Sequence, residues 1–553
     1  MIKTELEEEI SALIENSVSQ IAQGEGSSKL ALSSLEVSDE STHGDLSSNA
    51  ALQLSKSIKK NPRLIADSLM QILNKEIADS SLKDVIGKIE IAGAGFINFF
   101  IKDEYFYQKI DEIIKLDSNF GRIDIGRKEK AQIEFVSANP TGPLSIAHAR
   151  QAAVGDSLAR IMEFLGFSVT REYYLNDEGN QVNILGESIK LRLKELQGEK
   201  IDFPEDYYQG DYIKEIAAKI SANGGKNHNF NFSEYGIKYI LDGIKKDLAD
   251  FNVEFDAWSS QAALTKSGKI EEAIEFLRKK GFIYERDDAV WFKSTLFGDD
   301  KDRVVIKSDK SYTYLAPDIA YHKDKFAQGF KRVINLWGPD HHGYIPRIRA
   351  AVSALGQEKD TLSVVIVQLV TLLREGKVVP MSTRKASYVT LRQIIDEVGK
   401  DAARFFLVGR RVSSHLDFDL ELAKKESQEN PVYYIQYAFA RISSILHKEK
   451  EEGFVQGNAD LGLLKEAEEL LLMRKLSQFP RSLSLCLDML DPYPLTQYLT
   501  ELAADFHRFY DKHKVLDAAR ANLSQARLKL VNAVKIVLRN GLSLLGLSTP
   551  EKM

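Results

Sequence analysis

Residues 131–156 read AQIEFVSANPTGPLSIAHARQAAVGD. This stretch predicts a buried strand, a tight turn and a helix from about Ser145 to Leu165. The next segment, FSVTREYYLNDEGNQ at 167–181, has the pattern of a second strand followed by a loop. A strand, a crossover helix and another strand indicate a parallel, doubly wound sheet.

The turn between the first strand and the helix has the properties of an anion site. Free N–H groups at a helix start and the helix dipole both favour a phosphate there. Gly142 and its neighbours Pro140 and Pro143 fix a tight backbone that a nucleotide could approach closely. On these residues alone an alternative stays open, in which Ser145 is only an N-cap and His148 a partly buried surface residue. The glycine spacing of a Walker or dinucleotide motif is absent.

Composition limits the class of protein. The chain has 553 residues, enough for two to four domains, and its 44% hydrophobic and 28% charged residues are typical of a soluble globular protein. No apolar run is long enough to cross a bilayer, and the acidic start MIKTELEEEI is not an export signal. A single cysteine, Cys486, fits a reducing compartment, so we expect a cytoplasmic protein with no membrane partner. The net charge of −6 argues against nucleic-acid binding over the whole surface but permits a local basic face.

The chain divides into four predicted regions. A small α/β domain covers 1–115 and a Rossmann-like, parallel-sheet domain covers 125–375, with an insertion at about 191–299. The sheet is expected to resume with RVVIKS and RVINLWG. A loop and connecting segment follow at 376–429. The last region, 430–553, is helix-periodic throughout and predicts an all-α bundle.

A second phosphate-binding candidate is GKVVPMSTRKASYVTL at 376–391. Its centre, Met381 to Lys385, is a short cationic loop between two apolar segments. Adjacent Arg and Lys side chains suit the charge that develops on a departing pyrophosphate. Taken alone, a solvated hairpin tip is the alternative.

Together the two stretches resemble the paired signatures of class I aminoacyl-tRNA synthetases, and further blocks narrow the resemblance to the arginyl-tRNA synthetase family. These blocks occur in the family's order, and with the N-terminal HGDLSSNAALQLSK and GAGFINFF they span nearly the whole chain. The catalytic and C-terminal blocks are TREYYLNDEGNQ, YQGDYI, TYLAPDIAYHKDKF, WGPDHHGYIPR, YVTLRQIIDEVGKDAARFF and NGLSLLGLSTPEKM.

The resemblance implies an arginine–tRNA ligase, which uses ATP with Mg²⁺ to form arginyl-adenylate and passes the arginyl group to the 3′ end of tRNA(Arg). Catalytic roles would fall to His148, Ser145, Arg384 and Lys385. ATP would contact Pro140, Thr141, Gly142, Pro143, His148, Asp340, His341, Met381 and Ser382. L-Arginine would contact Ser137, Asn139, Asp177, Gln181, Tyr314 and Asp318. Asp318 and Tyr314 would accept hydrogen bonds from the guanidinium. Selection of arginine over lysine requires acceptors that match the planar shape of the guanidinium, because a single point charge does not distinguish the two side chains.

The partner tRNA would be held at both ends of the chain. Residues 501–540 contain eight Lys or Arg against four acids, opposite in sign to the whole chain. Phe506, Phe509 and Tyr510 offer aromatic faces for stacking on unpaired bases, or they are simply core. The expected tRNA contacts are Lys59, Lys60, Tyr434, Tyr437, Arg441 and Arg527. The family resemblance also implies a monomer.

The sequence departs from the family pattern at its signatures. Ser145 and Ala147 stand where the first signature has histidine and glycine, and Pro380 and Thr383 stand where the second has lysines. A second hypothesis is therefore a catalytically silent, tRNA-binding relative. A third, a metal-dependent phosphoesterase built on the triplet at 340–342, lacks a second ligand cluster, and we expect no protein metal site.

Overall fold

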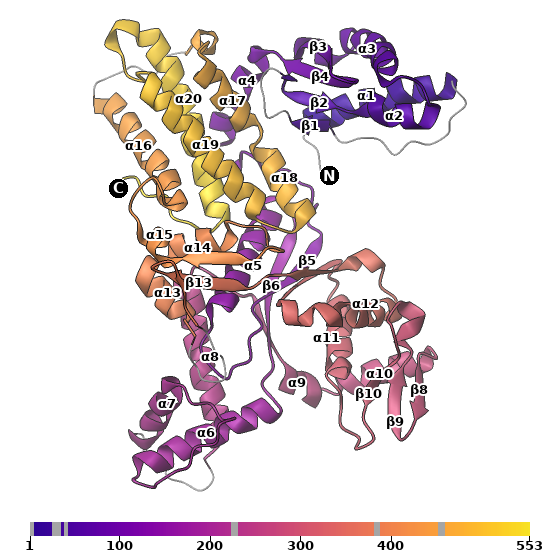
Figure 1. Cartoon of the computed structure of the whole chain (residues 1–553), viewed down its shortest axis with the longest axis vertical. Coiled ribbons are helices and arrows are strands. Elements are labelled where there is room, and N and C mark those ends of the chain that lie inside the picture. The colour runs from indigo at the N-terminus through magenta and orange to yellow at the C-terminus, as the bar shows by residue number, and fades with distance from the viewer. Residues whose placement is uncertain (1–4, 25–34, 38–42, 223–229, 381–387, 452–458) are drawn as a thin grey trace.

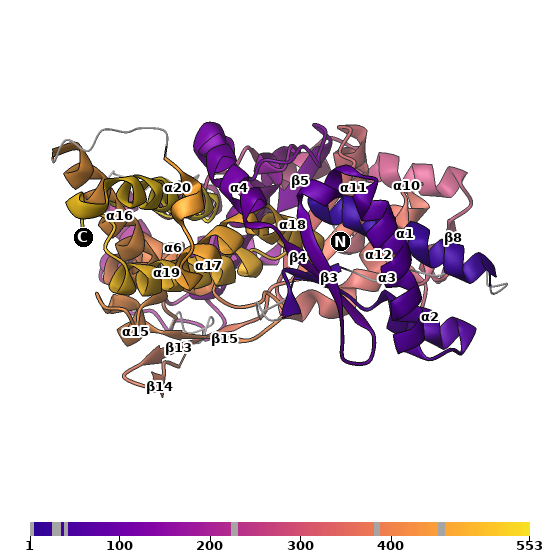
Figure 2. The same cartoon turned by 90° about the horizontal axis from the view of Figure 1, so that it is seen from above.

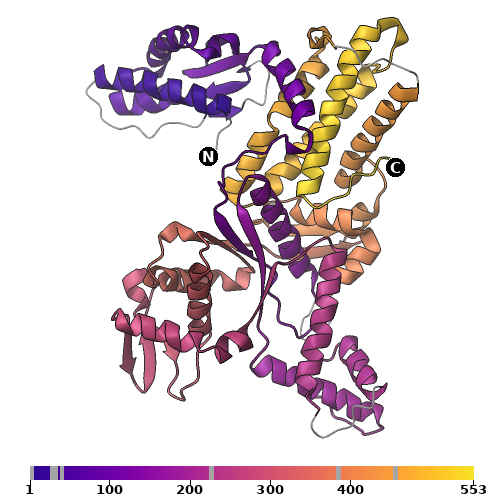
Figure 3. The same cartoon turned by 180° about the vertical axis from the view of Figure 1, so that it is seen from behind.

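The computed structural model describes residues 5–24, 35–37, 43–222, 230–380, 388–451 and 459–553. Figure 1 shows a central sheet with the N-terminal domain and a helical bundle above it and two smaller lobes below. The view from behind in Figure 3 shows the same two lower lobes as separate projections from the sheet.

The central sheet has five strands in the order β12-β11-β5-β6-β7, and every neighbouring pair is parallel. The sequence prediction of a doubly wound sheet is confirmed. The chain starts at β5, moves outward through β6 and β7, and later returns to β5's other side with β11 and β12. The switch point therefore lies between β5 and β11, which is where such sheets bind ligands beyond the strands' carboxyl ends. The strands are β5 Lys130–Glu134, β6 Ser168–Leu175, β7 Ala257–Ser260, β11 Arg332–Trp337 and β12 Leu362–Ile366.

The crossover from β5 to β6 is helix α5, Ile146–Phe164, which matches the predicted helix closely. Most of its residues are buried because it lies between the sheet and the C-terminal helices, with contacts to α14 and α18. The small residues Ala152, Ala153 and Gly155 allow this close packing: a Cβ on Gly155 would lie 2.3 Å from the ring of Phe135.

Two predictions about the insertion are wrong. RVVI forms β10, Arg303–Ile306, which pairs antiparallel with β9 in a separate sheet of order β10-β9-β8. In addition, β7 lies inside the predicted insertion 191–299 but belongs to the parallel sheet, so this range contains two excursions and not one. A short apolar strand can pair in either sheet, and only the neighbours it meets decide.

The first excursion contains α6 Asn180–Leu196, α7 Asp211–Ala222 and α8 Phe232–Asp250. The second contains α9 Gln261–Lys266, α10 Lys269–Lys279, β8 Ile283–Arg286, β9 Ala289–Phe292, β10 and α11 Leu315–Ala327, and α12 Ile345–Ala354 follows β11.

The N-terminal domain is a four-stranded antiparallel sheet of order β1-β2-β4-β3. Helices α2 and α3 contact β4 and β3, and α1 packs on α3. The view from above in Figure 2 shows this domain beside the helical bundle, with α4 between them. Helix α4 contacts α17 and α20 of the bundle, which attaches the domain to it. The elements are α1 Glu5–Gly24, β1 Leu35–Val37, β2 Leu46–Ser48, α2 Ala50–Ile58, α3 Pro62–Ala78, β3 Ile86–Ala92, β4 Phe96–Ile101 and α4 Asp103–Leu116.

The C-terminal region is all helical from Pro431 onward, as predicted. Its long helices bury apolar stripes against one another, and the side chains of Phe506 and Phe509 are fully buried core residues. The helices are α16 Pro431–Glu451, α17 Ala467–Ser477, α18 Phe479–Met489, α19 Tyr493–Lys512 and α20 Ala521–Leu544. A connecting region precedes them, with β13 Val370–Arg374, β14 Lys377–Val378, α13 Leu391–Val398, α14 Lys400–Val408, β15 Leu416–Asp419 and α15 Leu420–Lys424.

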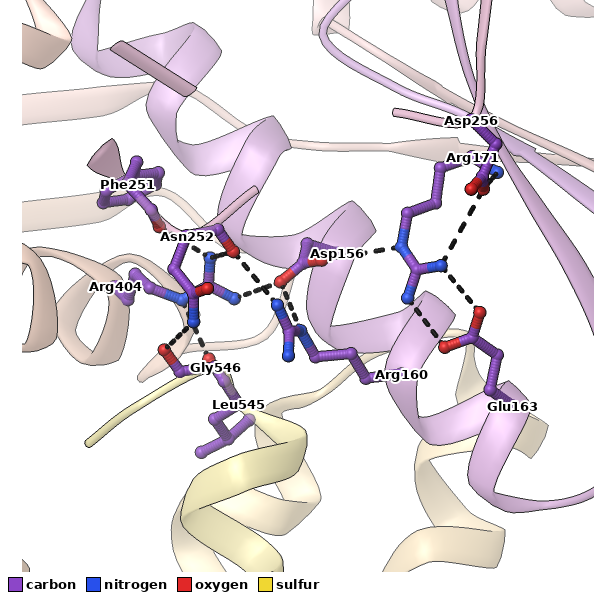
Figure 4. A network of polar contacts seen from close by, with 10 residues as sticks. All are labelled: Asp156, Arg160, Glu163, Arg171, Phe251, Asn252, Asp256, Arg404, Leu545 and Gly546. Carbon is purple, nitrogen blue, oxygen red and sulfur yellow. Dashed lines mark hydrogen bonds and ion pairs between the residues drawn. The ribbon is translucent and has the colours of Figure 1, made fainter. Parts of the chain in front are cut away.

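An ion-pair network with a buried centre joins the sheet domain to the C-terminus (Figure 4). We call it the domain junction, and its charged members are Asp156, Arg160, Glu163, Arg171, Asp256 and Arg404. At its centre, Arg404 Nη2 of α14 donates to Asp156 Oδ2 of α5 at 2.5 Å, and both side chains are essentially inaccessible. The remaining donors of Arg404 reach main-chain carbonyls: Leu545 O at 2.9 Å and Phe251 O at 3.0 Å. One side chain thus ties α5 to the loop after α8 and to the end of α20.

Among the described residues, no helix is long and apolar enough to cross a membrane.

Candidate active site

The backbone is strained where it leaves β5. Val136 has φ +66° and Ser137 has φ +39°, a region that non-glycine residues, and β-branched ones above all, rarely adopt. Ser137 Oγ accepts from Tyr174 N–H at 3.1 Å and lies 3.1 Å from Glu134 Oε1, to which it donates. These contacts with β6 stabilise the bend that sends the chain across the carboxyl end of the sheet.

His148 lies in the first turn of α5, directly after that bend. Its Nδ1 accepts from the main-chain N–H of Ser145 at 3.2 Å, and the Ser145 hydroxyl is also 3.2 Å from Nδ1. Because Nδ1 is an acceptor, the neutral ring carries its hydrogen on Nε2. Burial lowers the pKa of His148 to about 4, although Asp340 opposes the shift. At neutral pH His148 is therefore an uncharged Nε2–H donor, and Ser145 acts as its N-cap and orienting partner.

Below the turn lies a group of buried charges that we call the acidic pocket: Glu134, Glu172, Asp318 and Lys325. Lys325 Nζ of α11 donates to Glu134 Oε2 at 2.6 Å, and its side chain is completely inaccessible. Burial alone would raise the pKa of Glu134, but the attraction of Lys325 outweighs it and holds this pKa below its usual value. Glu172 accepts from Ser259 Oγ and Tyr321 Oη, both at 2.5 Å, and from the amide of Gln132. The pocket therefore contains three acids and one base.

Asp318, like Glu172, has no cationic hydrogen-bond partner among the described residues, and a single phenol is the side chain that donates to it. Tyr344 Oη donates to Asp318 Oδ2 at 2.5 Å. Burial raises the pKa of Asp318 to about 6, and the nearby charge of Glu134 adds to the rise, whereas Tyr344 and Lys325 oppose it. A cation that binds beside this carboxylate would therefore stabilise its ionised form.

Other predicted arginine contacts lie around this pocket in different states. Asn139 Nδ2 donates to Gln181 Oε1 at 2.7 Å, so the structure brings these two together. Asp177 accepts from Ser260 Oγ at 2.6 Å and Ala262 N at 2.9 Å, which makes it a helix cap at the start of α9. Tyr314 is 78% exposed, in contrast to the half-buried Asp318 one helical turn later.

The predicted nucleotide contacts follow the carboxyl ends of two neighbouring strands. Residues 140–148 come after β5, and Asp340 and His341 come after β11, on the short 3₁₀ turn Pro339–Tyr344. The influence of Asp340 on His148 shows that the two segments face each other. Met381, Ser382, Arg384 and Lys385 lie outside the described residues. In the described part of the chain, no group of three or more His, Cys, Asp or Glu side chains is arranged to hold a metal ion.

The predicted tRNA contacts on the bundle form an aromatic and cationic cluster. The guanidinium of Arg441 lies 4.6 Å from the ring centres of both Tyr437 and Tyr510. Tyr437 stacks on His507 of α19 at 5.9 Å, and Tyr434 lies 4.4 Å from the same imidazole. Lys59 and Lys60 are exposed at the end of α2 in the N-terminal domain.

Arg527 is the exception, and the prediction that it contacts tRNA is contradicted by its position. Its residue is 3% exposed, Nε donates to Glu469 Oε1 at 2.7 Å, and Nη1 donates to Lys514 O at 2.9 Å. Both partners lie within the bundle, so Arg527 stabilises the core and is not available to a phosphate. A count of basic residues cannot separate a cation that points inward from one that points outward.

Sequence reasoning missed Glu134, Lys325 and Tyr344. The signal for Glu134 was available, since a carboxylate at the end of a buried parallel strand is unusual. Lys325 follows Asp318 by seven positions and His322 by three, so all three share one face of α11. His322 Nδ1 bonds Asp318 O at 2.8 Å, and burial lowers its pKa to about 4. No local signal pointed to Tyr344, which meets Asp318 only through the tertiary fold.

Comparison with known sequences then decides the family. The model for the class I tRNA synthetase (R) catalytic domain matches residues 109–411, more than half of the chain. The chain belongs to the arginyl-tRNA synthetase family. The arginyl-tRNA synthetase N-terminal domain matches residues 4–101, and the DALR anticodon-binding domain matches residues 435–553.

Relatives and solved structures agree with this family. The chain is 50% identical over 525 residues to a protein of Citrifermentans bemidjiense named arginine–tRNA ligase, covering 92% of this chain and 93% of that one. The arginine–tRNA ligase of Anoxybacillus flavithermus is 47% identical, with 94% of each chain covered. The arginyl-tRNA synthetase of Thermus thermophilus, at 20% identity, shares the fold with a TM-score of 0.75 over 99% of this chain. Family models thus match the N-terminal, central and C-terminal parts of the chain.

Proposed function

We propose that this protein is an arginine–tRNA ligase that activates L-arginine with ATP and transfers it to the 3′ end of tRNA(Arg). One observation supports the proposal above the others: a cluster of three acids and one base lies beside the helix-start turn at the switch point of a parallel sheet, with Glu134 Oε1 3.1 Å from Ser137 Oγ. The pocket suits a cationic side chain, and the turn suits a phosphate.

The arginine guanidinium would face Asp318, whose carboxylate is already oriented by Tyr344. A planar guanidinium can donate two parallel N–H bonds to such a carboxylate, which an ammonium group cannot do. Asn139 and Gln181, already in contact, would hold the backbone groups of the amino acid.

ATP, with its accompanying Mg²⁺, would place its phosphates at the Pro140–His148 turn. The Nε2–H of neutral His148 would donate to the α-phosphate as the arginine carboxylate attacks it and pyrophosphate leaves. Alignment and charge stabilisation would then supply most of the rate enhancement, because the protein forms no covalent bond to either substrate. Arg384 and Lys385 stay predicted contacts of the leaving pyrophosphate.

The tRNA would be bound by Tyr434, Tyr437 and Arg441 on the bundle and by Lys59 and Lys60 on the N-terminal domain. The rings and the guanidinium together provide the stacking and cation–π surface that unpaired bases use. A monomer and a cytoplasmic location stay predictions. A catalytically silent relative is not favoured, because the pocket retains its buried charges and His148 its donor tautomer.

The test is a charging assay with ATP, Mg²⁺, labelled arginine and a tRNA(Arg) transcript. Acid-stable arginyl-tRNA is the expected product, and a tRNA(Lys) transcript with labelled lysine is the negative control. Tight tRNA binding without charging, even at high protein concentration, would replace the proposal with the silent tRNA-binding relative.

Two substitutions test the assigned roles. Asp318→Ala should abolish arginine use and leave the Kd for tRNA nearly unchanged. His148→Ala should slow adenylate formation by roughly 100-fold, the order expected for loss of one charge-stabilising donor, and Ser145→Ala should slow it far less. Charging that survives Asp318→Ala would show that the guanidinium binds elsewhere.

A further inference from the structure

Three phenol groups hold the carbonyls of the predicted ATP turn from outside. Tyr173 Oη of β6 donates to Ala138 O at 2.9 Å, and Tyr212 Oη of α7 donates to Thr141 O at 2.8 Å. Tyr388 Oη, from the segment between β14 and α13, donates to Pro143 O at 2.9 Å. Three elements that are distant in sequence therefore converge on six residues of backbone.

Two of these hydroxyls meet at Gly142. A Cβ built on Gly142 would lie 3.2 Å from both Tyr212 Oη and Tyr388 Oη. This spacing is tighter than an ordinary contact, so a side chain at this position would push against both phenols. The absent side chain and the two hydroxyls form one packed unit.

Fixing a carbonyl also fixes the next N–H group. In a trans peptide unit the C=O and the following N–H point in opposite directions. Because Tyr212 and Tyr388 hold the carbonyls of Thr141 and Pro143 on their own side of the turn, the N–H groups of Gly142 and Leu144 are turned toward the opposite side. This arrangement removes partial negative charge from the face where phosphates would bind and presents donors there.

The Tyr388 segment is itself attached to the start of α5. Ile146 N donates to Val389 O at 3.2 Å, and Leu391 N donates to Leu144 O at 2.8 Å, with a β-bridge between Ser145 and Thr390. The hydroxyl of Tyr388 is thus held in register with the turn by main-chain bonds. Tyr212 reaches the turn from α7 of the first excursion, which gives that lobe a direct contact with the site.

We propose that Tyr212 and Tyr388, with Tyr173 behind them, are positioning residues that orient the ATP turn of this synthetase. They touch neither substrate and act through the backbone of residues 138–143. The inference rests on the proposed function, because it assigns ATP to this turn. Burial raises the pKa of Tyr388 to about 12 and also raises that of Tyr212, so both stay protonated donors at physiological pH.

The test is a set of tyrosine-to-phenylalanine variants, which remove each hydroxyl and keep each ring. ATP–pyrophosphate exchange with tRNA present should show a KM for ATP that rises about 3- to 10-fold in Tyr212→Phe, the range expected for one lost hydrogen bond. Tyr388→Phe should raise it only about twofold, since main-chain bonds still hold that segment. The KM for arginine should stay unchanged in both variants. Tyr235→Phe, a phenol on α8 packed against Phe230, is the matched control and should match the wild type.

A glycine substitution gives an independent check. Gly142→Ala should raise the KM for ATP in the wild-type background, because the new Cβ pushes against both hydroxyls. In the Tyr212→Phe/Tyr388→Phe background the same substitution should cost less, since those oxygens are gone. Equal cost in both backgrounds would contradict the packed unit.

Binding of a non-hydrolysable ATP analogue, measured by calorimetry, gives a readout that does not depend on turnover. Weaker binding in Tyr212→Phe at an unchanged Tm supports the proposal. An unchanged KM for ATP in Tyr212→Phe would overturn it, and so would an equal rise in the KM for both substrates together with a lower Tm, which would show a general loss of packing. A wild-type protein that fails to charge any tRNA would instead refute the proposed function, so the two failures are distinguishable.

Discussion

Two charge clusters of the sheet domain, the domain junction and the acidic pocket, differ in charge balance. The junction has three acids and three bases, and its central guanidinium has its donors taken up by Asp156 and main-chain carbonyls (Figure 4). The acidic pocket has three acids and only Lys325 as a base. In a balanced network each acid can pair with a base of the same chain. In a network with excess acids, a carboxylate is left that a cationic ligand can pair with. Charge balance therefore separates a structural cluster from a binding site more reliably than burial does.

The largest effect should come from breaking the junction. Asp156→Ala leaves the buried guanidinium of Arg404 without its acid, and we expect a loss of about 3–5 kcal/mol in the free energy of unfolding. Denaturant titration measures it, with Asp211→Ala in the exposed pair with Lys214 as a control that should change stability by less than about 1 kcal/mol. Equal stability in the two variants would show that the junction does not hold the domains together.

The same kind of change in the pocket should act on binding and not on stability. Asp318→Asn keeps the shape but removes the charge that is proposed to face the guanidinium, so the KM for arginine should rise by about 100-fold or more. Because burial disfavours the ionised form of Asp318, replacing it with a neutral side chain should leave Tm equal or slightly higher. A clear fall in Tm would show that Asp318 stabilises the fold as the charges of the domain junction do, which would contradict the difference between the two clusters.

Acid should weaken arginine binding through the same group. With a pKa of about 6 in the free protein, Asp318 becomes protonated below that pH, and the affinity for arginine should fall about tenfold per pH unit there. Its raised pKa also means that the folded state binds the proton more tightly than the unfolded state between about pH 4 and 6, so ionisation of Asp318 lowers stability as pH rises through that window. Calorimetric titration from pH 5 to 8 measures the affinity, and Asp318→Asn should remove this pH dependence.

The smallest effect concerns the bundle, where the same distinction applies to two arginines. Arg441 faces aromatic rings at the surface, and Arg527 is paired inside. Arg441→Ala should weaken tRNA binding about 3- to 10-fold, with a reduced salt dependence if the guanidinium also meets phosphate. Arg527→Lys should leave the Kd for tRNA unchanged in a filter-binding assay. A larger effect from the Arg527 variant would restore it as a tRNA contact.

Much of the fold could be predicted because its signals are local. The strand-turn-helix of residues 130–164 and the apolar periods of the C-terminal bundle each depend on neighbours in the chain. The two errors, at β7 and β10, concern short strands whose sheet is chosen by contacts with distant partners. Periodicity states that a strand forms but not which strand it pairs with.

In the candidate site, too, features that depend on neighbouring residues could be predicted, and features that depend on distant partners could not. Pro140, Gly142 and His148 are adjacent in sequence, and their chemistry is readable there. The partnership of Asp318 with Tyr344, the pairing of Lys325 with Glu134 and the inward turn of Arg527 join residues that are far apart or equally plausible as surface groups.

The sequence by itself determined the parallel sheet, the strand-turn-helix at its start and the family, because these depend on the order and spacing of neighbouring residues. Only the tertiary structure decided which charges are paired within the chain and which are left for a ligand. The physical reason is that a charge's free energy depends on burial and on partners within a few ångströms, and the chain brings those partners together only when it folds.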